Sequence, residues 1–190
     1  MYKKCCIMVE ILFFSYKQRG IFMETMKNTC ELTNAVHFED AKAIVGEWLA
    51  HANTNQHMVV CATFDVDYLN TINEQYGWAA GNEVLRHLAA ICHEASPFVT
   101  RHDDEMSVIW KDCSVEEGVV NATNLFKTLQ QTIVQFEGNE IPVSVSMGIT
   151  HNHAGDVTCF EELVSTATTA IHKSKNLGRN RFIMDVAPYL

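Results

Sequence analysis

The chain has 190 residues, of which 47% are hydrophobic and 19% are charged, and this balance is typical of one soluble domain with a full core. Its formal net charge of −9 argues against binding to long nucleic acid, because phosphate backbones are bound by basic surfaces. Seven cysteines without a C-x-x-C spacing argue against a zinc ribbon and favour reduced thiols in a cytoplasmic protein.

Residues 1–33 are predicted to form a disordered leader, with Met23 or Met26 as alternative starts. The apolar run after Cys5 follows two lysines, but Glu10 interrupts it and no cleavage site follows, so a signal peptide is not indicated. The run is also far shorter than the roughly 20 residues that span a bilayer. Membrane association is therefore the alternative that we favour less.

Residues 34–55 are predicted to contain an N-terminal amphipathic helix, because Ala41, Ile44, Val45, Trp48, Leu49 and Ala52 recur at helical spacing. A domain over residues 56–185 and a C-terminal tail over residues 186–190 are expected to follow.

The domain begins with a buried strand, M-V-V-C-A-T-F-D, and a helical region from Tyr68 to about Ser96 that breaks at residues 77–81. F-V-T-R and E-M-S-V-I-W are predicted to pair as a hairpin. Capping boxes at Ser114 and Thr158 are expected to open two more helices, the first ending near residue 135 and the second at Gly178.

Between these two helices, I-P-V-S-V-S-M-G-I-T is expected to form one strand. The resulting order β-α-α-β-β-α-β-α-β predicts an α+β fold. We expect an antiparallel-centred sheet with packed helices, related to the ferredoxin-like palm.

Three segments carry a family resemblance: F-D-V-D-Y-L-N-T-I-N-E-Q-Y-G-W-A-A-G-N-E-V-L at residues 64–85, H-D-D-E-M at residues 102–106, and A-T-T-A-I-H-K-S-K-N-L-G-R-N-R-F at residues 167–182. Together they resemble the GGDEF family, the domain of diguanylate cyclases, over about residues 56–185. The resemblance implies a nucleotidyl-cyclase fold that joins two GTP molecules into cyclic di-GMP, with two protomers face to face.

A carboxylate at a strand end, with another on the neighbouring hairpin, suits a divalent cation that bridges phosphates. The resemblance implies that Asp65, the backbone carbonyl of Val66 and Asp104 bind Mg²⁺ or Mn²⁺. It also makes Asp104 and Glu105 the catalytic acidic residues, with Asp104 helping to deprotonate the attacking 3′-hydroxyl. The alternative is that Asp65 and Asp67 cap the following helix.

By the same resemblance Asn73 and Asn82 contact the base, while Lys175 and Arg179 hold the triphosphate. Asn82 stands where the family has Asp. Guanine presents two donors, which a carboxylate accepts together, whereas a carboxamide offers one acceptor and one donor, so we expect relaxed choice between GTP and another nucleoside triphosphate. The alternatives are that Asn82 caps a helix and that Lys175 and Arg179 are solvated helix-end charges.

The signature hairpin is altered. His102 and Asp103 stand in the two glycine places, and Met106 replaces Phe, which is a milder change. Side chains at the glycine places crowd the nucleotide, and Asp103 adds negative charge beside its phosphates. An alternative alignment matches Arg101 and His102 to the family's R-Y and deletes one glycine.

Two functions remain open. The first is a degenerate GGDEF domain, catalytically impaired, that binds a nucleotide or a protein partner in cyclic dinucleotide signalling. The second is an active, homodimeric diguanylate cyclase with relaxed base specificity. The sequence favours the first because of His102 and Asp103. The second is supported by the retained residues Asp65, Asp104, Lys175 and Arg179.

Overall fold

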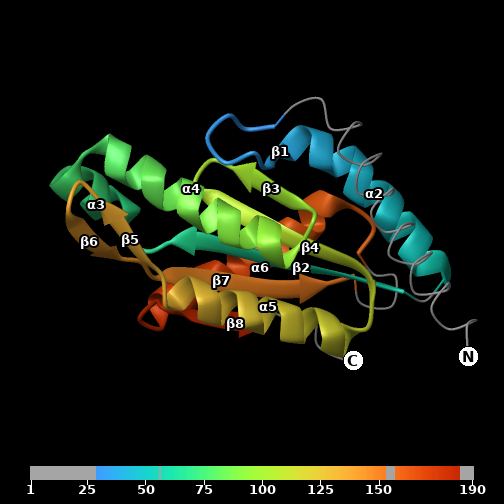
Figure 1. The fold of residues 1–190 in the computed structure, drawn as a ribbon. Coiled ribbons are helices and arrows are strands. Elements are labelled where there is room, and N and C mark those ends of the chain that lie inside the picture. Colours follow the sequence, from blue (N-terminus) through green and yellow to red (C-terminus); the bar gives the residue numbers. More distant parts are fainter. Residues whose placement is uncertain (1–28, 56, 153–156, 185–190) are drawn as a thin grey trace, which may run out of the picture.

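The computed structural model describes residues 29–55, 57–152 and 157–184. Most of the expected leader, all of the expected tail and any conclusion about them lie outside the described residues. A six-stranded sheet in the order β1-β3-β4-β2-β7-β8 forms the centre, with helices on both of its faces (Figure 1).

The strands are β1 (Val36–His37), β2 (Met58–Val66), β3 (Val99–His102), β4 (Glu105–Cys113), β5 (Ile133–Phe136), β6 (Asn139–Pro142), β7 (Val145–His151) and β8 (Arg181–Met184). The helices are α2 (Phe38–Asn55), α3 (Leu69–Tyr76), α4 (Trp78–Ala95), α5 (Val115–Gln130) and α6 (Phe160–Asn176).

The three central strands are antiparallel, because β2 pairs in this way with both β4 and β7. The outer pairs, β1 with β3 and β7 with β8, are parallel. The predicted α+β fold with an antiparallel-centred sheet is therefore confirmed.

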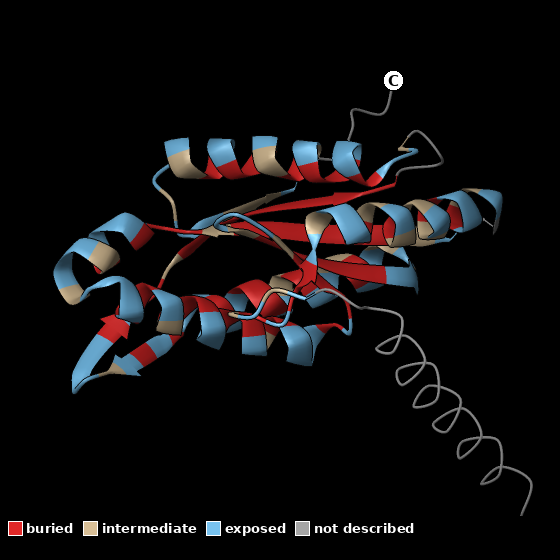
Figure 2. Ribbon diagram, turned by 90° about the horizontal axis from the view of Figure 1, so that it is seen from above, coloured by how far each residue is buried: buried red, intermediate tan, exposed pale blue. Residues whose placement is uncertain are grey.

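Strand β2 is covered on both faces, which explains its continuous apolar run. One core joins the sheet to α4 and α5, and a second joins it to α2 and α6. Figure 2 shows the buried strands between helices whose outer surfaces are exposed. The polar end of β2 emerges from this packed centre.

Several element boundaries differ from the prediction. The helical break is at Gly77 alone (φ 87°), and Gly81 lies inside α4. The capping box at Ser114 is confirmed, with the Ser114 hydroxyl accepting from the Glu117 N–H at 3.1 Å. The capping box at Thr158 is wrong, because α6 begins after Cys159 without a side-chain cap.

Helix α5 ends at Gln130 and is followed by the hairpin β5–β6, which the sequence analysis did not predict. The single strand expected over I-P-V-S-V-S-M-G-I-T is two strands, β6 and β7. Its proline stands last in β6, where the missing N–H costs no central ladder bond.

Residues 29–37 precede α2 as a turn and the short strand β1. The N–H of Cys30 donates to the Ala35 carbonyl at 2.8 Å, and Val36 pairs with Thr100 of β3. Part of the expected leader is thus folded against the sheet edge. None of the helices in the described part of the chain combines the length and apolar character needed to cross a membrane.

Candidate functional site

Asp65 stands near the end of β2, directly opposite Glu105 of β4 on one side and Ser146 of β7 on the other. The Asp65 carboxylate accepts a hydrogen bond from the Lys175 ammonium at 2.8 Å, and these side chains are only 21% and 27% exposed. An ion pair that is partly shielded from water is worth more than a surface pair. Its two members are 110 positions apart in the chain and are brought together by the docking of α6 on β7.

The carboxylate opposite Asp65 is that of Glu105, and it accepts from the Thr168 hydroxyl of α6 at 2.9 Å. Asp104 is the second residue of the turn between β3 and β4; it is exposed and makes no hydrogen bond with the described residues. The structure therefore brings Asp65 and Glu105 together and leaves Asp104 beside them in the turn.

These residues fit a Mg²⁺ or Mn²⁺ ion. Mg²⁺ is commonly held by one or two carboxylates while phosphate and water oxygens complete its shell, and Asp65 and Glu105 face each other at a sheet end with the Val66 carbonyl next in the chain. Within the described residues no three His, Cys, Asp or Glu side chains form a metal cluster.

Asp67 does not cap a helix. The N-cap of α3 is Tyr68, which makes no side-chain cap bond, so the capping alternative for Asp65 and Asp67 is wrong. The fully buried Asp67 carboxylate accepts from the Ser146 hydroxyl at 2.7 Å, the Ser144 hydroxyl at 3.1 Å and the Asn180 N–H at 3.0 Å. Asp67 therefore fastens the α6–β8 connection to the end of β2.

That connection carries Arg179. Gly178 (φ 107°) and Arg179 (φ 62°) turn the chain back over the site, so the Arg179 Nε lies 4.0 Å from the Asp67 carboxylate and its guanidinium lies 4.8 Å from the centre of the Tyr68 ring. Neither Lys175 nor Arg179 is a freely solvated helix-end charge. The Lys175 ammonium and the Arg179 guanidinium thus each lie near a carboxylate at the end of β2.

The signature turn contains two residues, Asp103 and Asp104, between the paired His102 and Glu105. Asp103 alone of the two altered glycine places has a positive φ (51°), which Asp tolerates better than most residues. The Asp103 carboxylate is 89% exposed, and its carbonyl accepts from the Arg101 Nε at 2.7 Å. Asp103 therefore adds an unburied negative charge beside Asp104.

His102 lies outside the tight part of the turn. Its ring packs on Phe38, the first residue of α2, with centroids 5.0 Å apart. Met106 is fully buried in the core, in accord with a mild replacement of Phe. The crowding expected from two side chains in the turn thus falls on Asp103.

The candidate base contacts lie at the corner between α3 and α4. The Asn73 Oδ1 is buried and has no hydrogen-bond partner in the described part of the chain. The Asn73 carboxamide lies against Gly81, where an added Cβ would overlap it. Asn82 is exposed inside α4, whose N-cap is Gly77, so the capping alternative for Asn82 is wrong.

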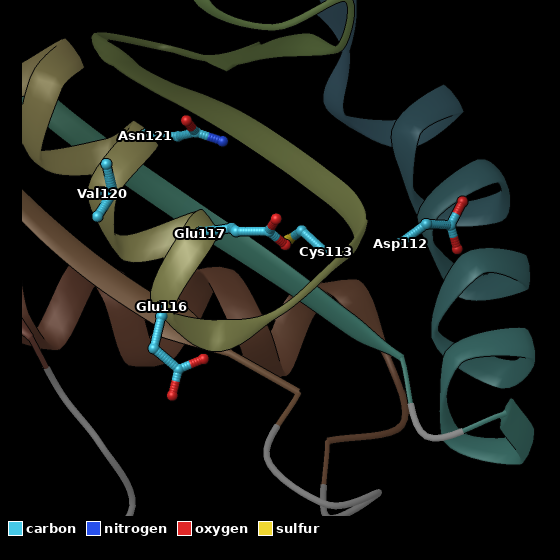
Figure 3. A pocket seen from close by; sticks show the side chains of 6 residues that line it. All are labelled: Asp112, Cys113, Glu116, Glu117, Val120 and Asn121. Atoms are coloured by element: carbon cyan, nitrogen blue, oxygen red, sulfur yellow. The ribbon is translucent and has the colours of Figure 1, made fainter. Parts of the chain in front are cut away.

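A recess of about 550 Å³ lies elsewhere, at the opposite end of β4. Six side chains from the end of β4 and the first part of α5 line it: Asp112, Cys113, Glu116, Glu117, Val120 and Asn121 (Figure 3). Its acidic lining repels phosphate, and the Glu117 carboxylate is already bonded to the Ser114 N–H at 2.9 Å. The recess is separate from the carboxylates at the signature turn.

Residues 29–181 match the family model described as diguanylate cyclase, GGDEF domain. The chain belongs to the GGDEF domain family. The match begins well before residue 56, where we expected the resemblance to start, and so includes β1 and α2.

Among curated GGDEF relatives, diguanylate cyclase A of Treponema denticola is 29% identical over 121 residues, covering 62% of this chain and 32% of the relative. Diguanylate cyclase DosC of Escherichia coli is 28% identical over 139 residues, covering 70% of this chain and 30% of the relative. The chain thus spans about a third of the length of these relatives.

Solved GGDEF structures share the fold. The GGDEF domain of DgcB from Caulobacter crescentus, in complex with c-di-GMP, superposes with a TM-score of 0.76 at 19% identity and covers 83% of this chain and 95% of that one. Diguanylate cyclase SiaD from Pseudomonas aeruginosa, in complex with its activator SiaC, gives 0.79 at 16% identity, with 96% and 71% covered.

The sequence analysis missed three features of this site: the bonds of Asp67 to Ser144 and Ser146, the bond from Thr168 to Glu105, and the exposed Trp78 at the α3–α4 corner. A signal existed for the first, since Ser144 and Ser146 alternate along a strand region beside β2 and so face one side. The second depends on how α6 docks, which no local pattern specifies.

Proposed function

We propose that this GGDEF domain is a cytoplasmic, nucleotide-binding regulatory module of cyclic dinucleotide signalling whose cyclase chemistry is impaired. The proposal joins two sets of residues. The groups suited to metal and triphosphate are retained around Asp65, and the turn that must lie against the nucleotide is altered.

In this proposal Asp65, Glu105 and the Val66 carbonyl hold Mg²⁺ or Mn²⁺, which when bound neutralises phosphate charge. The Lys175 ammonium, which lies against Asp65 in the free domain, leaves that carboxylate and binds the phosphates. Its positive charge is therefore at the site before the nucleotide binds. Arg179 lies near Asp67 and Tyr68 at the same end of β2 and, in this proposal, also binds the triphosphate. Asn73 and Asn82 contact the base.

The observation that carries the impairment is the exposed Asp103 carboxylate, which stands in a glycine place of the two-residue turn, beside the expected catalytic residue Asp104. An incoming triphosphate meets this added negative charge. Like charges at about 4 Å repel by about 1 kcal/mol in water and by more where water is excluded. A nucleotide can still bind from the Lys175 side, but the close approach that cyclisation requires is opposed.

An active diguanylate cyclase is the second candidate function. The retained Asp65, Glu105, Lys175 and Arg179 favour it, and it requires a homodimer because each bound nucleotide attacks the other. Control of this domain by a protein partner is an intermediate case; SiaD, which shares the fold, was solved in complex with its activator SiaC.

The test is a double substitution, His102→Gly with Asp103→Gly, assayed for cyclic dinucleotides with Mg²⁺ and GTP or ATP. We expect synthesis to appear or to rise at least tenfold, because space is opened and a negative charge is removed. Adding Asp104→Asn should abolish it, since this removes the carboxylate that the resemblance assigns to metal binding and to deprotonation of the 3′-hydroxyl, with little change in shape. Full activity in the unmodified protein, unchanged by the glycine pair, would contradict the proposal.

A further inference from the structure

Trp78 is the most exposed large hydrophobic side chain among the described residues, at 75%. Its ring makes no aromatic contact and its indole N–H no hydrogen bond within the described part of the chain. Tryptophan is strongly buried on average in proteins. An exposed Trp ring close to polar groups without hydrogen-bond partners therefore indicates a surface that a ligand could cover.

The polar groups beside Trp78 belong to the same corner. Trp78 is the first residue of α4 and Asn82 lies four residues on, so both project from one face of the helix, a turn apart. The N–H of Gly77 donates to the Asn73 carbonyl at 2.9 Å, and the Asn73 carboxamide lies against Gly81. The buried Asn73 Oδ1, which has no hydrogen-bond partner among the described residues, thus lies at the same α3–α4 corner from which Trp78 projects.

A planar ring with hydrogen-bond donors on its edge fits this set. The exposed Asn82 carboxamide offers one donor and one acceptor to the ring edge, the Asn73 carboxamide lies against the neighbouring Gly81, and the Trp78 face offers stacking. The single carboxamide of Asn82 offers one acceptor and one donor, so it cannot accept both donors of guanine as a carboxylate does, and edge recognition is weak. Stacking is tolerant of sequence because every base has a π-face.

We propose that Trp78 is a base-stacking residue that holds the nucleobase of a purine nucleotide at the α3–α4 corner, whichever base it is. The inference rests on the proposed nucleotide-binding function and deepens it. Affinity at this corner then comes mainly from the Trp78 ring, and the choice between guanine and adenine is correspondingly loose.

The experiment compares Trp78→Ala and Trp78→Phe with the unmodified protein in calorimetric titrations of GTP, ATP and inorganic tripolyphosphate, each with Mg²⁺. Trp78→Ala should weaken GTP and ATP binding about tenfold alike and leave tripolyphosphate unchanged, since that anion has no base. Trp78→Phe should stay within about threefold. Val120→Ala, which shortens another exposed apolar side chain (56% exposed), is the matched control and should change nothing.

A second readout is fluorescence. GTP and ATP should quench the emission of the unmodified protein, and the quench should disappear in Trp78→Phe although binding persists. If the unmodified protein binds nucleotides and Trp78→Ala binds them equally well, the stacking role is wrong and the proposed function stands. If the unmodified protein binds none of the three ligands, both fall. A change in oligomeric state without a change in affinity would assign Trp78 to a protein interface and overturn the inference.

Discussion

Asp67 should be the residue on which the site end of the domain depends most. Its carboxylate accepts three hydrogen bonds in a fully buried position, from the Ser144 and Ser146 hydroxyls and the Asn180 N–H. Asp67→Asn keeps the shape but removes the charge from all three bonds.

The magnitude follows from those bonds. Charge-assisted hydrogen bonds are roughly twice as strong as neutral ones, and neutral ones contribute about 1 kcal/mol each, so three such bonds should lose about 2–3 kcal/mol in Asp67→Asn. The hydroxyls can rotate to meet the new amide donor, but the Asn180 N–H cannot. Asp67→Ala leaves all three donors unpaired at about 1–3 kcal/mol each, so we expect about 4 kcal/mol or more.

Urea denaturation of both variants, with Glu94→Gln as the matched control, measures these losses. Glu94 is exposed on α4 and makes no hydrogen bond with the described residues, so its variant should unfold like the unmodified protein. Asp67→Asn should also weaken tripolyphosphate binding, because the Asn180 bond fixes the connection that carries Arg179. Removing a buried charge also relieves its desolvation cost; if Asp67→Asn proved as stable as the unmodified protein, that relief would outweigh the bonds and our reasoning would be refuted.

Two further predictions concern base choice and thiol reactivity. The unmodified protein should discriminate GTP from ATP by less than about tenfold, since one mismatched hydrogen bond is worth on the order of 1.4 kcal/mol. Asn82→Asp should restore a preference for GTP, and competition titrations measure both effects. Strong GTP selectivity in the unmodified protein would show that Asn82 does not read the base. Burial raises the pKa of the Cys61 thiol to about 12, so this thiol stays protonated in the folded protein well above pH 9; iodoacetamide at pH 8 followed by mass mapping should label the exposed Cys159 and leave Cys61 unlabelled until the protein unfolds. Early labelling of Cys61 would show that the sheet opens more readily than its packing implies.

Local patterns predicted much of this fold. The helical spacing around Val45 and the capping box at Ser114 depend on neighbouring residues, and both elements form where expected. The hairpin β5–β6 was missed because Ile133 and Val134 continue the apolar periodicity of α5. The turn at Glu137 and Gly138, both with positive φ, distinguishes a β-hairpin from a longer α5 helix.

The site was predictable as a list of residues but not as a set of bonds. Asp65 and Lys175 were each identified through family resemblance, yet their ion pair joins residues far apart in the chain and depends on how α6 docks. From the sequence, we expected Asp104 to be the carboxylate that faces Asp65, whereas the strand register puts Glu105 opposite Asp65. A one-residue difference in register reverses which side chain faces the site, and a sequence pattern does not specify it.

The central claim is that the domain binds a metal–nucleotide complex but does not cyclise it. The most direct test is a calorimetric titration of the unmodified protein with GTP and Mg²⁺, repeated with a chelator. Mass spectrometry of the solution recovered from the calorimeter then shows whether a cyclic dinucleotide has formed. We expect saturable binding at or below millimolar GTP, loss of that binding in chelator, and no cyclic di-GMP. The absence of binding heat at millimolar nucleotide, or abundant cyclic di-GMP in the recovered calorimeter solution, would contradict this expectation.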